Sequence, residues 1–199
     1  MSIKKLNEIV ASPFAEIGSS LLDVVSKVPL GSILVNVYKI GLGIDNYLLV
    51  KKLATFLNSM ENMEEEANEF LNSLSDVERE QVVDYMLNSL YNAESSDKAL
   101  IMGFIYKACA SKRIDLEMML RLTSIVNKAF VLDLVHLPEY KEPSTEFSIA
   151  ANEFINLGLI NNEVGGGWIN ESTWHLNKIG LLLCDILEEE GWFKQKAQQ

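Results

Sequence analysis

Residues that interrupt helices are sparse in this chain, and their scarcity constrains the fold more than any other feature. The 199 residues include only four prolines and eleven glycines, and three of the glycines are adjacent. No proline lies between Pro29 and Pro138. Because proline and glycine are the poorest helix formers, these long stretches predict a mainly α-helical protein. The hydrophobic content of 48% is ordinary for a globular chain of this length.

Hydrophobic periodicity places the individual helices. Ser75, followed three residues later by Glu78, matches the capping-box pattern and predicts that a helix begins there. Ser95 and its two successors predict the start of the next helix. The other expected helices cover residues 3–11, 13–27, 32–40, 44–60, 62–74 and 115–136, and together they predict a multi-helix bundle.

A short polar segment follows the last of these helices. Residues 137–143 hold two prolines and three charged side chains. Proline restricts both its own backbone and that of the preceding residue, so the segment predicts a stiff, exposed linker. We therefore expect a helical bundle over residues 1–137, a linker over 138–143 and a small appendage over 144–199.

The expected appendage has a helix, two apolar segments around a turn, and a final helix. Residues 157–160 read LGLI, residues 161–170 are rich in turn formers, and residues 174–177 read WHLN ahead of Gly180. From about residue 143 to 190 this order resembles the second half of a winged-helix domain. The resemblance implies an α/β-hairpin appendage, with residues 144–157 as its DNA-facing helix. A plain β-hairpin that closes a helical domain is the alternative.

The charge of this region argues against the usual task of a winged helix. Residues 144–177 contain no Lys or Arg, and the expected DNA-facing helix carries Glu146 and Glu153 instead. The whole chain has a formal net charge of −11. Because nucleic-acid affinity depends on cations that neutralise phosphates, we expect no nucleic-acid binding.

The most apolar part of the chain lies near its beginning. Residues 30–50 approach the roughly 20 apolar residues that a membrane-spanning helix needs, but Lys39 and Asp45 interrupt them. We expect a buried helical hairpin here, with Leu34 and Leu48 inside. A hairpin that inserts reversibly into a membrane and a spanning helix are the alternatives.

This segment and residues 51–57 (KKLATFL) also resemble certain uncharacterised bacterial helical proteins. The resemblance covers about a third of the chain and implies no chemistry. Some of those proteins resemble components of phage-defence or stress loci, which implies a bacterial origin and that kind of setting.

Groups able to catalyse a reaction are few. His136, His175, Cys109 and Cys184 are the only histidines and cysteines, and they have no paired ligand spacing. No nucleophile elbow, phosphate loop or dinucleotide fingerprint is present. We expect no enzymatic activity, metal or cofactor. Two cysteines in apolar surroundings and no signal peptide predict a cytoplasmic protein.

Three glutamates, at positions 188–190, end the expected final helix. Carboxylates oppose the helix dipole at this end. Either the helix continues through Trp192, which is the simpler interpretation, or a basic partner lies there.

The tryptophans are the candidate contact residues for a partner. Trp168 lies on a glycine-rich tip, where it suits either a protein partner or packing within the chain. Trp174 and Trp192 complete the set. We therefore expect a non-catalytic, acidic interaction protein that binds a protein partner or a second copy of itself. A membrane-active effector that uses residues 30–50 is the first alternative, and a nucleic-acid-binding regulator is the second.

Overall fold

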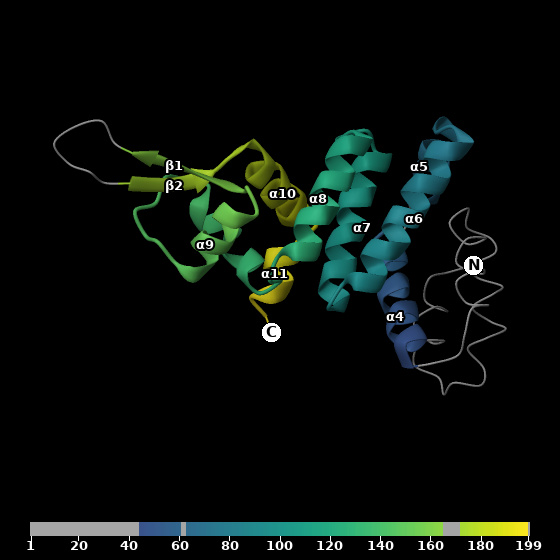
Figure 1. Ribbon diagram of the computed structural model, residues 1–199, viewed down its shortest axis with the longest axis horizontal. Helices are drawn as coiled ribbons and strands as arrows, with labels where there is room; N and C mark the ends of the chain where they lie inside the picture. Colours follow the sequence, from purple (N-terminus) through teal and green to yellow (C-terminus); the bar gives the residue numbers. More distant parts are fainter. Residues whose placement is uncertain (1–43, 61–62, 165–171, 199) are drawn as a thin grey trace. The chain divides into compact units, whose positions relative to one another are not determined.

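The computed structural model describes residues 44–60, 63–164 and 172–198. This part of the chain is mainly helical, with a small antiparallel sheet of two strands near the C-terminus (Figure 1). The predicted fold class is confirmed at that level. The helices expected over residues 3–40, most of the apolar segment 30–50, and the wing tip with Trp168 lie outside the described residues.

The chain divides into two compact units, Met1–Leu116 and Glu117–Gln199. The domain boundary expected at residues 138–143 stays a prediction. The described helices of the first unit are α4 (Ile44–Asn58), α5 (Glu64–Ser73), α6 (Asp76–Asn92) and α7 (Ser96–Ala110). Helix α7 packs against α4 and α5, and α4 also contacts α6.

Helices α4 and α7 approach each other closely at Gly103. A Cβ atom at this position would lie 1.7 Å from Ser59 Oγ and 2.9 Å from the backbone oxygen of Phe56. The Tyr106 ring, one turn further along α7, meets the rings of Phe56 and Phe70 edge-on, with centroids 5.7 and 5.6 Å away. The absence of a side chain at Gly103 therefore lets three aromatic rings close the core of this unit.

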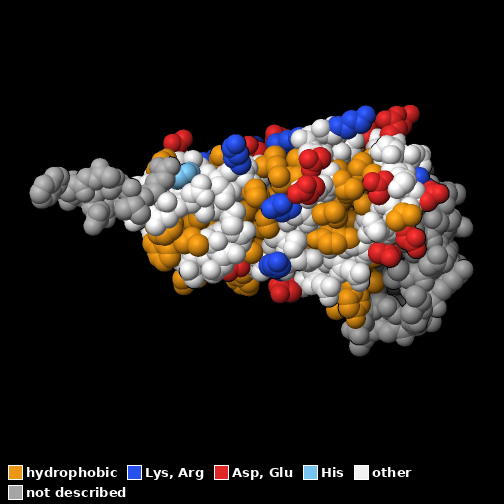
Figure 2. All heavy atoms as spheres, turned by 45° about the horizontal axis from the view of Figure 1, so that its top comes forward, with side chains coloured by type: hydrophobic (Ala, Val, Ile, Leu, Met, Phe, Trp, Pro, Cys, Tyr) orange, Lys and Arg blue, Asp and Glu red, His pale blue; other side chains and the backbone are white. Residues whose placement is uncertain are grey.

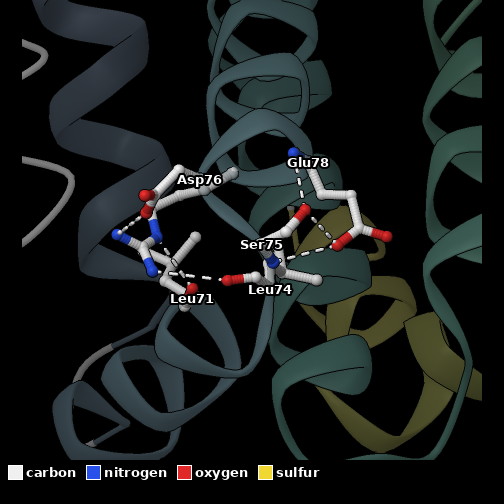
Figure 3. A network of polar contacts seen from close by, with 6 residues as sticks. Leu71, Leu74, Ser75, Asp76 and Glu78 are labelled. Atoms are coloured by element: carbon white, nitrogen blue, oxygen red, sulfur yellow. Dashed lines mark hydrogen bonds and ion pairs between the residues drawn. The ribbon is translucent and has the colours of Figure 1, made fainter.

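The predicted capping box between α5 and α6 is confirmed (Figure 3). Ser75 Oγ accepts a hydrogen bond from the backbone N–H of Glu78, and Ser75 N–H donates to Glu78 Oε2 at 2.9 Å. Arg79 closes the same corner, because its Nε donates to the Leu71 carbonyl at 2.9 Å. The end of one helix and the start of the next are thus satisfied within a few residues.

The start of α7 is also confirmed, with Ser95 as its N-cap. At the end of α6, Lys52 Nζ donates to the carbonyls of Tyr91 and Ala93 at 2.7 and 2.8 Å. This lysine therefore reaches from α4 to carbonyls that have no partner within their own helix, and partial burial lowers its pKa.

The second unit contains the two described strands. Its elements are α8 (Leu116–Lys128), the 3-10 helix η1 (Asp133–Tyr140), α9 (Ile149–Asn156), β1 (Ile160–Val164), β2 (Ser172–Leu176), α10 (Lys178–Glu189) and α11 (Trp192–Lys196). The register pairs Ile160 with Leu176 and Val164 with Ser172. Ile160 and Leu176 are buried, so the inner end of the hairpin belongs to the core of this unit.

The helix expected over residues 115–136 is shorter than predicted. It ends at Lys128, and η1 follows. The apolar periodicity runs on through Phe130 and Leu132, but both are more than half exposed. The expectation of an exposed linker is wrong at Tyr140, which is only 2% exposed. Apolar residues look alike in a sequence whether they face the core or the solvent, which is why the pattern failed here.

The boundaries in the appendage differ from the predictions in a similar way. The helix expected over residues 144–157 starts only at Ile149, after the N-cap Ser148. The first strand starts at Ile160 instead of residue 157, because the chain must first turn at Gly158, where φ is +69°. The final helix does not continue through Trp192. Gly191 breaks it with φ of +70°, a conformation that glycine adopts without strain.

The apolar segment near the beginning of the chain is described only from Ile44 onward. Leu49 is buried, but Leu48 is half exposed, so the expectation that Leu48 lies inside is wrong. Among the helices of the described ranges, none has the length and apolar content needed to cross a bilayer.

Candidate protein-binding surface

Large apolar side chains are exposed where the chain enters α9. Phe147 is 54% exposed and Ile149 is 86% exposed, and the half-buried Trp174 of β2 lies against the Phe147 ring. We call these three residues the Phe147 surface. Figure 2 shows hydrophobic side chains exposed in the region beside the hairpin.

A backbone pairing brings this surface together. Ser144 N–H donates to the Trp174 carbonyl at 2.9 Å, and Trp174 N–H donates to the Ser144 carbonyl at 2.8 Å. Ser144 Oγ then accepts a hydrogen bond from the backbone N–H of Glu146, which turns the chain. As a result the Phe147 ring lies against Trp174, with centroids 5.1 Å apart and planes tilted by 47°.

Ser148 fixes the backbone between the two exposed residues. Its Oγ accepts a hydrogen bond from Ala151 N–H, and the same oxygen lies 2.9 Å from the hydroxyl of Tyr140. Tyr140 is buried and meets Phe154 edge-on, with ring centroids 5.9 Å apart. Phe147 and Ile149 are therefore presented on either side of an anchored residue. Such preorganisation reduces the entropy that a binding surface loses when a partner docks.

The pairing register explains why Trp174 is only half covered. Alternate residues of a strand share one face of a sheet, so Trp174 lies on the same face as Leu176, which is buried. Its cross-strand partner is Asn162, which is exposed. The core therefore covers Leu176 on this face. The Phe147 ring covers part of Trp174 and remains exposed itself.

Carboxylates are the main charged groups in this stretch of the chain. Residues 144–177 include four glutamates and no Lys or Arg. The preceding cation, Lys141, is held by α10: its Nζ donates to Asp185 at 3.0 Å and to Glu188. Both hydrogen bonds raise the pKa of Lys141 above its ordinary value, and the one to Glu188 has the larger effect. Lys141 therefore lies beside the acidic end of α10.

The structure places the three predicted contact residues very differently. Trp174 contributes to the Phe147 surface. Trp192 is 0% exposed and meets Phe193 edge-on at 5.3 Å, so it belongs to the interior. Trp168 lies outside the described residues, and its role stays a prediction.

Sequence reasoning missed Phe147, although a local signal was present. An apolar residue just before an N-cap usually packs against the fourth residue of the helix. Here Phe147 precedes the N-cap Ser148, and the fourth helical residue is Asn152. Because this helix offers Phe147 no apolar partner at that position, its ring is available to Trp174 and to the solvent.

The groups that could carry out chemistry are dispersed and protected. Cys109 and Cys184 are buried, and this burial raises the pKa of each thiol to about 11. At neutral pH neither thiol supplies a nucleophilic thiolate. His136 Nδ1 lies 2.7 Å from a carboxylate oxygen of Glu139 on the surface. Within the described residues, no three His, Cys, Asp or Glu side chains converge on a point where they could hold a metal ion.

No protein-family model, curated protein or solved structure matches this chain. Its function therefore has to be inferred from the described residues themselves. Among these, the Phe147 surface combines two strongly exposed apolar side chains with a half-buried tryptophan.

Proposed function

We propose that this chain is a non-catalytic interaction protein that binds another protein through the Phe147 surface. The observation that carries the proposal is the exposure of Phe147 and Ile149 on a backbone that Ser148 and Tyr140 hold in place. Single exposed apolar residues are common on protein surfaces. Here Phe147 lies against the half-buried Trp174, and Ile149 is exposed two residues further along the chain. Aromatic residues are enriched at the centre of protein interfaces.

Burial of these side chains would supply part of the free energy of binding. Complete burial of a Phe or Ile side chain is worth about 1.5–3 kcal/mol relative to exposure. A partner that covers Phe147 and Ile149 would gain part of this for each residue. Because these backbone positions are already fixed, little of the gain would be lost to ordering the segment.

The proposed winged-helix relationship supports a protein partner over a nucleic acid. The order α9, β1, β2, α10 and the pairing of Ser144 with Trp174 suit such a domain, and α9 would then be its contact helix. The exposed positions of α9 are all uncharged: Ile149, Asn152, Ile155 and Asn156. A helix that approaches phosphates needs cations, whereas neutral side chains around an apolar residue suit a protein surface.

Site-specific photo-crosslinking would test this proposal. A photoreactive phenylalanine analogue is placed at position 147 of the full chain in cells that naturally produce it. Tyr91, an aromatic residue of the first unit with similar exposure, is the control position. We expect a discrete crosslinked protein from position 147 that Ile149→Asp abolishes. Equal crosslinking from both positions, or none from position 147, would refute the proposal.

A further inference from the structure

We infer that the Phe147 surface binds a basic amphipathic segment of a partner protein, with an apolar residue at its centre and Lys or Arg around it. This inference rests on the proposed function and adds the chemistry of the partner. It follows from two exposed carboxylates, Glu142 and Glu146, which lie just before Phe147 along the chain.

The carboxylates are placed to contact the rim of a partner. Glu146 is exposed and directly precedes Phe147, and Glu142 is exposed just before Pro143. In the opposite direction, the next cation along the chain is Lys178, the first residue of α10. Lys141 is the nearest cation along the chain before them, and it is already engaged by Asp185 and Glu188. A docking partner would therefore bring the compensating positive charge.

The aromatic rings suit the same residue types. A Lys or Arg side chain can lay its aliphatic stem along an apolar surface while its charged end reaches a carboxylate. Guanidinium and ammonium groups are also attracted to the faces of Trp and Phe rings. Trp174 and Phe147 with Glu146 beside them offer both interactions within one short stretch of structure.

The same charges disfavour other occupants. A second copy docked symmetrically would bring two acidic rims together, in a chain whose net charge is already −11. Phosphate-bearing surfaces would be repelled in the same way. Binding of a basic segment would instead be favoured by the carboxylates at the edge of the surface. Charges at the edge of an interface mainly affect the association rate and the specificity of binding.

The probe for the test is a random linear peptide library displayed on phage and selected on the immobilised full chain. We expect enriched peptides to carry several Lys or Arg residues around one or two large apolar residues. Synthetic versions of these peptides should bind at least tenfold more weakly to Phe147→Ala, a change of about 1.4 kcal/mol. The Tyr91→Ala variant is the matched control and should bind the same peptides with the affinity of the wild type.

Two further variants isolate the charge. Glu146→Gln should weaken binding several-fold at low salt and reduce its dependence on ionic strength, whereas Glu66→Gln, at an exposed position of the first unit, should not. Circular dichroism verifies that each variant is folded.

The outcomes separate the inference from the proposed function. Enriched peptides that need Phe147 but carry no excess of cations would overturn the inference and leave the proposed function standing. A concentration-dependent dimer that Phe147→Ala abolishes, detected by sedimentation, would do the same by making a second copy the occupant. Peptides that bind without regard to Phe147, or no enrichment at all, would overturn both.

Discussion

Phe56 and Phe147 each pair with another aromatic ring, one in each unit of the molecule. Phe56 of α4 is 2% exposed and packs on Tyr106, whereas Phe147 is 54% exposed and packs on Trp174. Tyr106 is itself fully enclosed, but Trp174 lies toward the outer end of a two-stranded sheet. An aromatic pair is therefore not by itself evidence of a core. What separates the two pairs is whether further elements cover them.

The largest expected effect tests whether Phe56 is a core residue and Phe147 a surface residue. Phe56→Ala should lower the free energy of unfolding by about 3–5 kcal/mol, because it leaves a cavity beside Tyr106. Phe147→Ala should change it by only about 0.5 kcal/mol, as is usual for a surface residue. Urea denaturation of the full chain measures both. Equal losses would mean that Phe147 is a structural residue and that the surface is not free.

Two glycines, Gly103 in the first unit and Gly180 in the second, extend the comparison to the backbone. A Cβ atom at Gly180 would lie 2.1 Å from the carbonyl oxygen of Leu159, which accepts a hydrogen bond from Asn177 and cannot easily move. At Gly103 the nearest atom is the hydroxyl of Ser59, which can rotate, and the nearest backbone atom, the Phe56 oxygen, lies farther away at 2.9 Å. We expect Gly180→Ala to cost about 3 kcal/mol and Gly103→Ala about 1–2 kcal/mol. Thermal denaturation gives the order, and the reverse order would show that α10 has room to shift.

Two N-cap serines compare the units in a third way. Ser75→Ala should cost about 1 kcal/mol, the usual value for a lost cap. Ser148→Ala should cost about 2 kcal/mol, because it also deprives the buried Tyr140 hydroxyl of its partner. The double variant Ser148→Ala with Tyr140→Phe is the control, and it should recover part of the additional loss. Equal costs for the two serines would mean that the Tyr140 contact is unimportant for stability.

The smallest expected effect concerns Lys141. Lys141→Met should cost at most about 1 kcal/mol at neutral pH, since its two ion pairs lie near the surface. The folded state raises the pKa of this lysine, so its contribution is complete below the unfolded value of about 10.4 and is lost as the pH rises through the folded value. The difference between wild type and variant should thus stay constant from pH 7 to about 9 and shrink in stronger alkali. A difference that grows with pH would contradict this assignment.

Features that depend on neighbouring residues were predictable. The capping box at Ser75 and Glu78, and the N-cap at Ser95, are confirmed because a cap is satisfied within three or four residues of chain. Features that depend on distant contacts were not predictable in the same way. Helix α8 ends before Phe130, and the interior position of Trp192 differs from its predicted exposure to a partner.

The sequence by itself determined the helical class, the helix caps and the absence of cations over residues 144–177, because composition and local hydrogen bonding decide these properties. The tertiary structure decided which aromatic residues face the solvent. Ser144 pairs with Trp174 across thirty positions of the chain, and this pairing brings Phe147 to the surface. Exposure depends on which elements cover a side chain. That covering is set by long-range packing, which the residue type and its immediate neighbours do not encode.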